Sequence, residues 1–178
     1  MGERVLVTYA THTGSTAEVA SVIADVLASE GTAVDVRPAG SVEGIAGYQA
    51  VVVGSPLHSG QWLPEAVSFV NTHRTALCRI PVAFFILCML PHDTAEDRRA
   101  KAAAVDTLRV MLKPVALGVF AGAMDYGKLS AIQRLQVQTK GLPEGDFRDW
   151  EAIRAWAAGL RPALLADSRQ RLASTRQP

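Results

Sequence analysis

Six consecutive small residues near the N-terminus could bind an anion. Residues 11–16, Thr-His-Thr-Gly-Ser-Thr, follow an apolar, strand-like run and precede a helical pattern. The start of a helix offers about four unpaired N–H donors and roughly half a positive charge, and Gly14 would let the backbone approach a ligand closely. Further donors come from the four hydroxyl side chains, Thr11, Thr13, Ser15 and Thr16. The segment therefore predicts a phosphate-binding loop, in which His12 is at most partly protonated near neutral pH.

Other phosphate-binding motifs are excluded by residue type. A P-loop needs a lysine after its second glycine, but the first lysine of the chain is Lys101. The dinucleotide fingerprint needs three spaced glycines, and this segment has only Gly14. A second interpretation stays open, in which Thr13 or Ser15 caps the helix and Glu18 completes a capping box from Ser15. The position of the loop after the first strand favours the phosphate site.

The composition is that of an ordinary globular domain. Lys and Arg exceed Asp and Glu by 18 − 17 = +1 in 178 residues, and 49% of the residues are hydrophobic, which gives no reason to expect a nucleic-acid partner. Cys78 and Cys88 are the only cysteines, so we expect neither a disulfide scaffold nor a metal site. The N-terminus does not resemble a signal peptide and no apolar run is long enough to span a bilayer. We therefore expect a cytoplasmic protein.

Short β-branched runs alternate with longer helical patterns. Strands are expected over residues 5–10, 33–37, 48–54, 80–87 and 115–123. Helices are expected over residues 15–30, 63–77, 94–112 and 150–165. The third helix would be capped by Asp93 or Thr94, and the last would be bent at Pro162. Residues 125–149 are expected to be irregular or partly helical, and amphipathic.

Continuous apolar strands separated by helices predict an α/β fold with a parallel sheet covered on both faces. Right-handed crossovers make such a sheet doubly wound. Ligands of these folds lie at the carboxyl ends of the strands, where the strand order reverses. The loops at that edge, and so the expected site, are residues 11–16, 55–62, 88–93 and 124–128.

Several stretches resemble a known family. "TYATHTGSTAEVA" is similar to the phosphate loop of flavodoxins, Thr/Ser-x-Thr-Gly-x-Thr. "YQAVVVGSPLHSGQWLPEAVSFV", "GVFAGAMDYGKL" and "DWEAIRAWA" resemble later parts of that family, and most of all its menaquinone-dependent protoporphyrinogen dehydrogenases of the HemG type. The resemblance implies a flavodoxin-like three-layer sandwich with a five-stranded parallel sheet in the order 2-1-3-4-5. Residues 1–166 would form one FMN-binding domain, and residues 167–178 a flexible polar tail.

The resemblance also implies where FMN would bind. The phosphate would lie in the first loop, and the isoalloxazine ring between the 55–62 and 88–92 loops. The residues expected to contact the cofactor are Thr11, His12, Thr13, Gly14, Ser15, Thr16, Ser55, Pro56, Leu57, His58, Ser59, Gly60, Trp62, Cys88, Met89, Leu90 and His92.

Alternatives stay open for several of these residues. Trp62 could stack on the flavin or pack on the core at the start of a helix. Met89 and Leu90 could line the ring or end a buried strand. Cys88 is expected to be a small buried apolar residue rather than a reactive thiol.

His58 and His92 are either ordinary polar residues or a source of charge or protons beside a reduced flavin. No acidic residue occurs in the stretch 51–64, whereas electron-carrier flavodoxins surround their flavin with acidic residues. This difference favours a flavin of moderate reduction potential. His58 is the only candidate catalytic residue, and the catalytic group is otherwise unknown.

The resemblance implies an FMN-dependent oxidoreductase that oxidises protoporphyrinogen IX or a related substrate and uses a quinone as acceptor. Its partners would be small molecules or a quinone, with a peripheral contact at the inner face of the membrane as one option. The alternatives are an electron-transfer flavodoxin, an FMN-dependent quinone reductase serving a redox partner, and a non-catalytic flavodoxin-like module.

The segment 125–149 is shorter than the corresponding segment of the family that the chain resembles. The identity of the substrate therefore stays open. Four residues could form an apolar face that covers the core or, alternatively, meets a porphyrinogen or a membrane: Leu129, Ile132, Leu135 and Val137. A porphyrinogen carries propionates and would need cations, for which the candidates are Arg134, Lys140, His92, Arg98 and Arg99.

Overall fold

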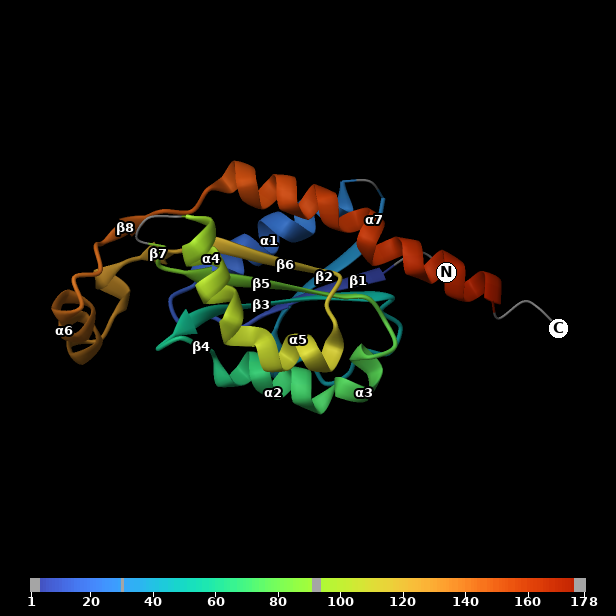
Figure 1. Ribbon diagram of the computed structural model, residues 1–178, viewed down its shortest axis with the longest axis horizontal. Coiled ribbons are helices and arrows are strands. Elements are labelled where there is room, and N and C mark those ends of the chain that lie inside the picture. Colours follow the sequence, from blue (N-terminus) through green and yellow to red (C-terminus); the bar gives the residue numbers. More distant parts are fainter. Residues whose placement is uncertain (1–3, 30, 91–93, 175–178) are drawn as a thin grey trace.

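A parallel sheet forms the centre of the molecule (Figure 1). The computed structural model describes residues 4–29, 31–90 and 94–174, with the backbone alone from residue 166 on. The five parallel strands are β1 (Arg4–Tyr9), β2 (Ala33–Pro38), β3 (Ala50–His58), β5 (Val82–Cys88) and β6 (Ala116–Ala121). They lie in the order β2-β1-β3-β5-β6, which confirms the predicted order 2-1-3-4-5.

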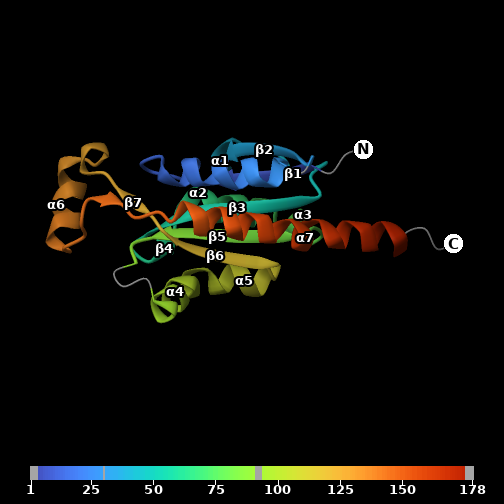
Figure 2. The same cartoon turned by 90° about the horizontal axis from the view of Figure 1, so that it is seen from above.

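Helices cover both faces of this sheet, so the predicted three layers are confirmed (Figures 1 and 2). One face is covered by α1 (Ser15–Ala28) and α7 (Trp150–Ser174). The other face is covered by α2 (Pro64–Thr72), α3 (Arg74–Leu77) and α5 (Asp106–Leu112), with α4 (Ala95–Ala102) beside α5. Because successive strand residues point to opposite faces, Leu6 joins one core cluster and Val5 and Val7 the other.

Strand β5 is the most deeply buried element, since all seven of its residues are buried. Phe84 points to the α2 side and Phe85 to the α1 side. A Cβ atom at Gly54 on the neighbouring strand β3 would lie 1.9 Å from the Phe85 ring. The large side chain of Phe85 therefore requires a glycine beside it on β3.

Strand β3 runs further than predicted. The sequence "GSP" was expected to end it at Gly54, but the strand continues to His58 and returns in a hairpin as β4 (Gln61–Trp62). Ser59 and Gly60 form the turn with φ values of 51° and 78°, as expected for a two-residue turn of the primed type. Pro56 is tolerated because β1 pairs with β3 only as far as Gly54, so beyond that point β3 is an edge on one side.

Two predicted helices are interrupted. The helix expected over residues 63–77 is divided at His73 into α2 and α3. The helix expected over residues 94–112 consists of α4, a 3₁₀ turn (Ala103–Val105) and α5. Thr94 caps α4 in a capping box with Asp97, while the alternative cap, Asp93, lies outside the described residues. A further 3₁₀ turn, Ala39–Ser41, follows β2.

Helix α7 passes through Pro162 and continues to Ser174. The predicted boundary after residue 166 therefore does not coincide with the end of the helix. Residues 175–178 of the predicted tail lie outside the described part of the chain.

Residues 125–149 leave the sheet at its carboxyl end. They follow β7 (Ala123–Met124), form a 3₁₀ turn (Tyr126–Lys128) and α6 (Ala131–Thr139), and return through β8 (Gly145–Asp146), which pairs with β7. Both views show α6 beyond the end of the sheet, away from the helical layers (Figures 1 and 2). Ile132 and Leu135 are 73% and 65% exposed, so the expectation that they cover the core is wrong. The paired strands β7 and β8 place α6 beyond the end of the core.

Candidate functional site

Helix α1 begins without a side-chain cap. Its N-cap residue is Gly14, which has a φ of 94° and donates its N–H to Thr11 Oγ1 at 3.0 Å. Both α4 and α6, by contrast, begin with complete capping boxes built by Thr94 and Ser130. The start of α1 therefore leaves backbone N–H donors for a ligand.

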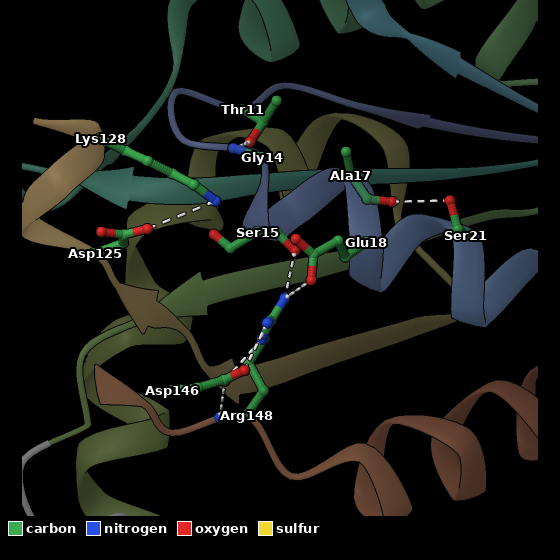
Figure 3. Close-up of polar contacts among 10 residues, drawn as sticks. All are labelled: Thr11, Gly14, Ser15, Ala17, Glu18, Ser21, Asp125, Lys128, Asp146 and Arg148. Atoms are coloured by element: carbon green, nitrogen blue, oxygen red, sulfur yellow. Dashed lines mark hydrogen bonds and ion pairs between the residues drawn. The ribbon is translucent and has the colours of Figure 1, made fainter. Parts of the chain in front are cut away.

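The expected capping box between Ser15 and Glu18 is wrong. Ser15 is the first residue of the helix rather than its cap. The Glu18 carboxylate instead accepts a hydrogen bond from Arg148 Nη1 at 2.8 Å (Figure 3). The N-cap residue is Gly14, one position before Ser15. Because glycine has no side chain, no capping side chain occupies the helix start.

Thr16 supplies a second indication of a ligand. Its side chain is completely buried in the first turn of α1, and its hydroxyl has no hydrogen-bond partner. An unsatisfied buried hydroxyl costs about 1–3 kcal/mol, a cost that an anion at the helix start would relieve. The uncapped helix, the left-handed Gly14 and this hydroxyl together fit a phosphate monoester such as that of FMN.

The 11–16 loop forms one wall of a cleft of about 210 Å³. The predicted cofactor-binding residues that line this cleft are Thr11, His12, Thr13, Ser15, Pro56, Leu57, His58, Ser59 and Met89. They come from three separate stretches of the chain, which the carboxyl ends of β1, β3 and β5 bring together. The rings of His12 and His58 meet edge to face with 5.5 Å between their centroids, so the first loop and the β3–β4 hairpin are in direct contact.

The α6 segment forms the opposite wall. Its lining residues, together with Met124 of β7, are Leu129, Gln133, Gln136, Val137, Lys140 and Leu142. Gln133 and Gln136 lie on one face of α6 because they are spaced by three residues, and Lys140, the C-cap residue, follows four positions later. The glutamines were missed by sequence reasoning, since their type carries no signal of a site. Leu129, Val137 and Lys140 were noted in the sequence only for other roles.

Several predicted cofactor residues lie outside the cleft lining. Ser55 is buried, and its Oγ accepts the Leu63 N–H at 2.9 Å, which fastens the hairpin to the start of α2. Trp62 is 5% exposed and packs edge to face on Phe84, with 5.0 Å between ring centroids. Its position is that of the core alternative and does not support stacking on a ligand.

Gly14 and Thr16, at the start of α1, are likewise not among the lining residues. The remaining predicted positions are structural or undescribed. Cys88 is buried, with Sγ 3.8 Å from the Phe120 carbonyl oxygen, as expected for a small apolar residue. Leu90 is partly buried and packs against the core on the α2 side, and Gly60 belongs to the hairpin turn. His92 lies outside the described residues.

The cations predicted to bind a propionate lie in different parts of the structure. Lys140 lines the cleft. Arg134 lies on α6 but is not among the lining residues, and Arg98 and Arg99 line another groove, beside β6 and Trp156. Among the lining residues that the structure describes there is no aspartate or glutamate, whereas His12, His58 and Lys140 can carry positive charge. The cleft is therefore suited to a planar, partly apolar molecule that bears negative charge.

Comparisons with known proteins agree with this geometry. A family model described as a flavodoxin domain matches residues 6–149. A protoporphyrinogen IX dehydrogenase (quinone) of Leishmania major is 26% identical over 92% of this chain and 77% of its own length. The enzyme of that name from Escherichia coli K12 is 24% identical over 86% of this chain and 92% of its own length. The chain also superimposes on a flavodoxin mutant from Pseudomonas aeruginosa, with a TM-score of 0.58, 14% identity and coverage of 90% and 98% of the two chains.

In the part of the chain that the structure describes, no helix combines the length and the apolar character needed to cross a bilayer.

Proposed function

Because the chain belongs to the flavodoxin domain family, which binds FMN, we propose that it is an FMN-dependent oxidoreductase that oxidises protoporphyrinogen IX, or a related substrate, with a quinone as acceptor. Support for the substrate comes from the two relatives, which carry the name protoporphyrinogen IX dehydrogenase (quinone). The two-electron chemistry would be supplied by the bound FMN.

The observation that carries the proposal is the charge of the cleft. Its described lining contains His12, His58 and Lys140 but no carboxylate. Positive neighbours favour the negative charge that a flavin gains on two-electron reduction, whereas a ring of carboxylates would oppose it. The cleft therefore favours the oxidoreductase over a low-potential electron carrier.

Each wall of the cleft has a role in this proposal. The first turn of α1 and the hydroxyls of residues 11–16 would hold the FMN phosphate. Pro56, Leu57 and Met89 would pack against the ring, and His58 would supply a charge or a proton beside it. Lys140, on the opposite wall, would bind a propionate of the substrate through a charge-assisted hydrogen bond.

A quinone acceptor that resides in a membrane would require a peripheral contact with its surface. The exposed side chains of Ile132 and Leu135 on α6 are suited to such a contact. They lie on the segment that also forms the cleft wall, so the acceptor would reach the cleft at this end of the molecule.

The test is anaerobic reduction of the purified FMN-loaded protein, followed by flavin absorbance. We expect protoporphyrinogen IX to bleach the flavin and a menaquinone analogue to restore the oxidised spectrum, over repeated turnovers. Bleaching only by a protein reductase would identify an electron carrier. Bleaching by NAD(P)H with turnover of quinone alone would identify a quinone reductase, and a protein that does not bind added FMN would be a non-catalytic module.

Two variants of α6 make the test specific for the cleft. K140Q removes the cation of the cleft wall, and R134Q removes a cation of the same helix outside the cleft lining. We expect K140Q to raise KM for protoporphyrinogen about fivefold or more, with FMN still bound, and R134Q to leave KM unchanged. Equal KM values for the two variants would contradict the assigned role of Lys140.

A further inference from the structure

Arg148 connects two distant parts of the chain at the base of the phosphate loop (Figure 3). Its Nη1 donates to Glu18 Oε2 at 2.8 Å and to the Ser15 carbonyl oxygen at 3.4 Å. On its other side, Nη2 and Nε donate to the two carboxylate oxygens of Asp146 at 2.6 and 2.8 Å. The guanidinium also lies over the Trp150 ring, 4.5 Å from its centroid.

This arrangement is more ordered than an ordinary surface ion pair. The Arg148 side chain is only 8% exposed, and the bidentate contact with Asp146 fixes the plane of the guanidinium. The hydrogen bond from Arg148 holds the pKa of Asp146 below its usual value, and the same bond raises the pKa of Arg148. Both groups therefore keep their charges throughout the neutral pH range.

The contacts lie on the first turn of α1, the turn that would face a phosphate bound at the helix start. Ser15 is the first residue of the helix, and Glu18 follows three positions later. The hydrogen bond to the Ser15 carbonyl constrains the peptide group next to the N–H donors of the helix start. Arg148 shares its charge between Asp146 and Glu18, so it offsets part of the negative charge of Glu18 that would repel a phosphate dianion.

We propose that Arg148 is a positioning residue for the phosphate-binding loop: it holds the first turn of α1 against β8 and draws the Glu18 carboxylate into a hydrogen bond, so that the helix start can accept the FMN phosphate. Arg148 does not line the described cleft, so it acts through Ser15 and Glu18. This role concerns cofactor binding and does not depend on the substrate proposed above.

The test compares FMN with riboflavin, which has the same ring system and lacks the phosphate. Apoprotein of wild type, R148M and R148K is titrated with each flavin, and binding is followed by flavin fluorescence. R148M keeps much of the apolar stem and removes the charge and the hydrogen bonds. R109M is the control, because Arg109 forms an exposed ion pair with Asp106 on α5.

We expect R148M to weaken FMN binding about tenfold or more, as for the loss of charge-assisted hydrogen bonds, and to change riboflavin binding less than about threefold. R148K keeps the charge but cannot bond both carboxylates in the same plane, so its FMN affinity should fall between those of wild type and R148M. R109M should bind both flavins like the wild type.

A purely structural role for Arg148 would give a different result. If R148M lost affinity for FMN and riboflavin by the same factor, or lost neither, the proposal would be overturned. Circular dichroism before each titration shows whether the variant is folded. Should R148M not fold, R148K alone decides by the same comparison, because a selective loss for FMN supports the proposal and an equal loss overturns it. A wild-type protein that binds neither flavin would instead contradict FMN binding itself.

Discussion

At the scale of single residues, the carboxylate of Asp35 accepts two hydrogen bonds outside the cleft. Its Oδ2 accepts hydrogen bonds from the Tyr48 hydroxyl at 2.5 Å and from Arg4 Nη2 at 2.6 Å. The bond from Tyr48 is the main cause that lowers the pKa of Asp35, and Arg4 and Arg37 lower it further. Burial and the bond to Asp35 raise the pKa of Tyr48. These contacts join β1, β2 and the loop that precedes β3.

Replacing Tyr48 should therefore alter the pH dependence of stability. A lowered Asp pKa contributes stability above the unfolded value, about 3.9, and this contribution is lost as the pH falls through the folded value. A raised Tyr pKa contributes stability below about pH 10, and this contribution is lost as the pH rises through the folded value. We expect Y48F to be less stable than wild type by about 1 kcal/mol at pH 7, with a smaller difference at both extremes, as measured by urea unfolding.

Y126F is the matched control, because the Tyr126 hydroxyl donates to the Leu142 carbonyl oxygen at 2.6 Å. A carbonyl does not titrate, so the difference between Y126F and wild type should stay constant as the pH falls below 5. If the difference in unfolding free energy between Y48F and wild type were also constant across this range, the pKa of Asp35 would not depend on Tyr48.

At the scale of elements, α6 has little tertiary support. It begins with the Ser130–Gln133 capping box, and it has no buried residue. Its stability must come mainly from its own hydrogen bonds and from the β7–β8 pair, because packing of a buried face contributes little. The cleft wall is therefore built on an element that can open without unfolding the core.

Removal of the cap should loosen α6 alone. We expect S130A to weaken the helix by about 1 kcal/mol and to raise hydrogen exchange of the α6 amides about fivefold, while amides of β5 keep the wild-type rate. T94A, which removes the equivalent cap of α4, is the control and should leave exchange in α6 unchanged. An S130A variant with faster exchange in β5 would show that α6 is part of the global folding unit.

At the scale of the whole molecule, the sheet separates two cores. One core lies beneath α1 and α7, and the other beneath α2, α3 and α5. Helix α7 contributes Ile153, Ala157, Leu160 and Leu164 to the first core. The C-terminal helix therefore holds α1 on the sheet from the opposite end of the chain.

Shortening one of these side chains should destabilise the entire fold. Leu160 is 1% exposed, and we expect L160A to lower the free energy of unfolding by about 2–5 kcal/mol in urea denaturation. V110A is the control, because Val110 is 79% exposed on α5, and it should stay within about 0.5 kcal/mol of wild type. Similar losses for the two variants would contradict the assigned core.

Much of the fold was predictable because it depends on local patterns. The β-branched runs that became β1 and β5, and the helical spacing of α1, are properties of short stretches. The breaks at His73 and after Ala102 were missed, since helical spacing continues across both positions and gives no stop signal. The hairpin after Gly54 was missed because Pro56 normally argues against a strand, and only the end of β1 makes the proline acceptable.

The candidate site divides along the same line. The sequence by itself determined the alternation of strands and helices along the chain and the chemistry of the 11–16 loop, since both follow from residues near one another in the chain. Only the tertiary structure decided that Trp62 lies in the core, that α6 supplies the second wall of the cleft, and that Arg148 meets Glu18 across 130 positions. These contacts depend on how the strand ends meet in space, and no local pattern of residue types encodes that meeting.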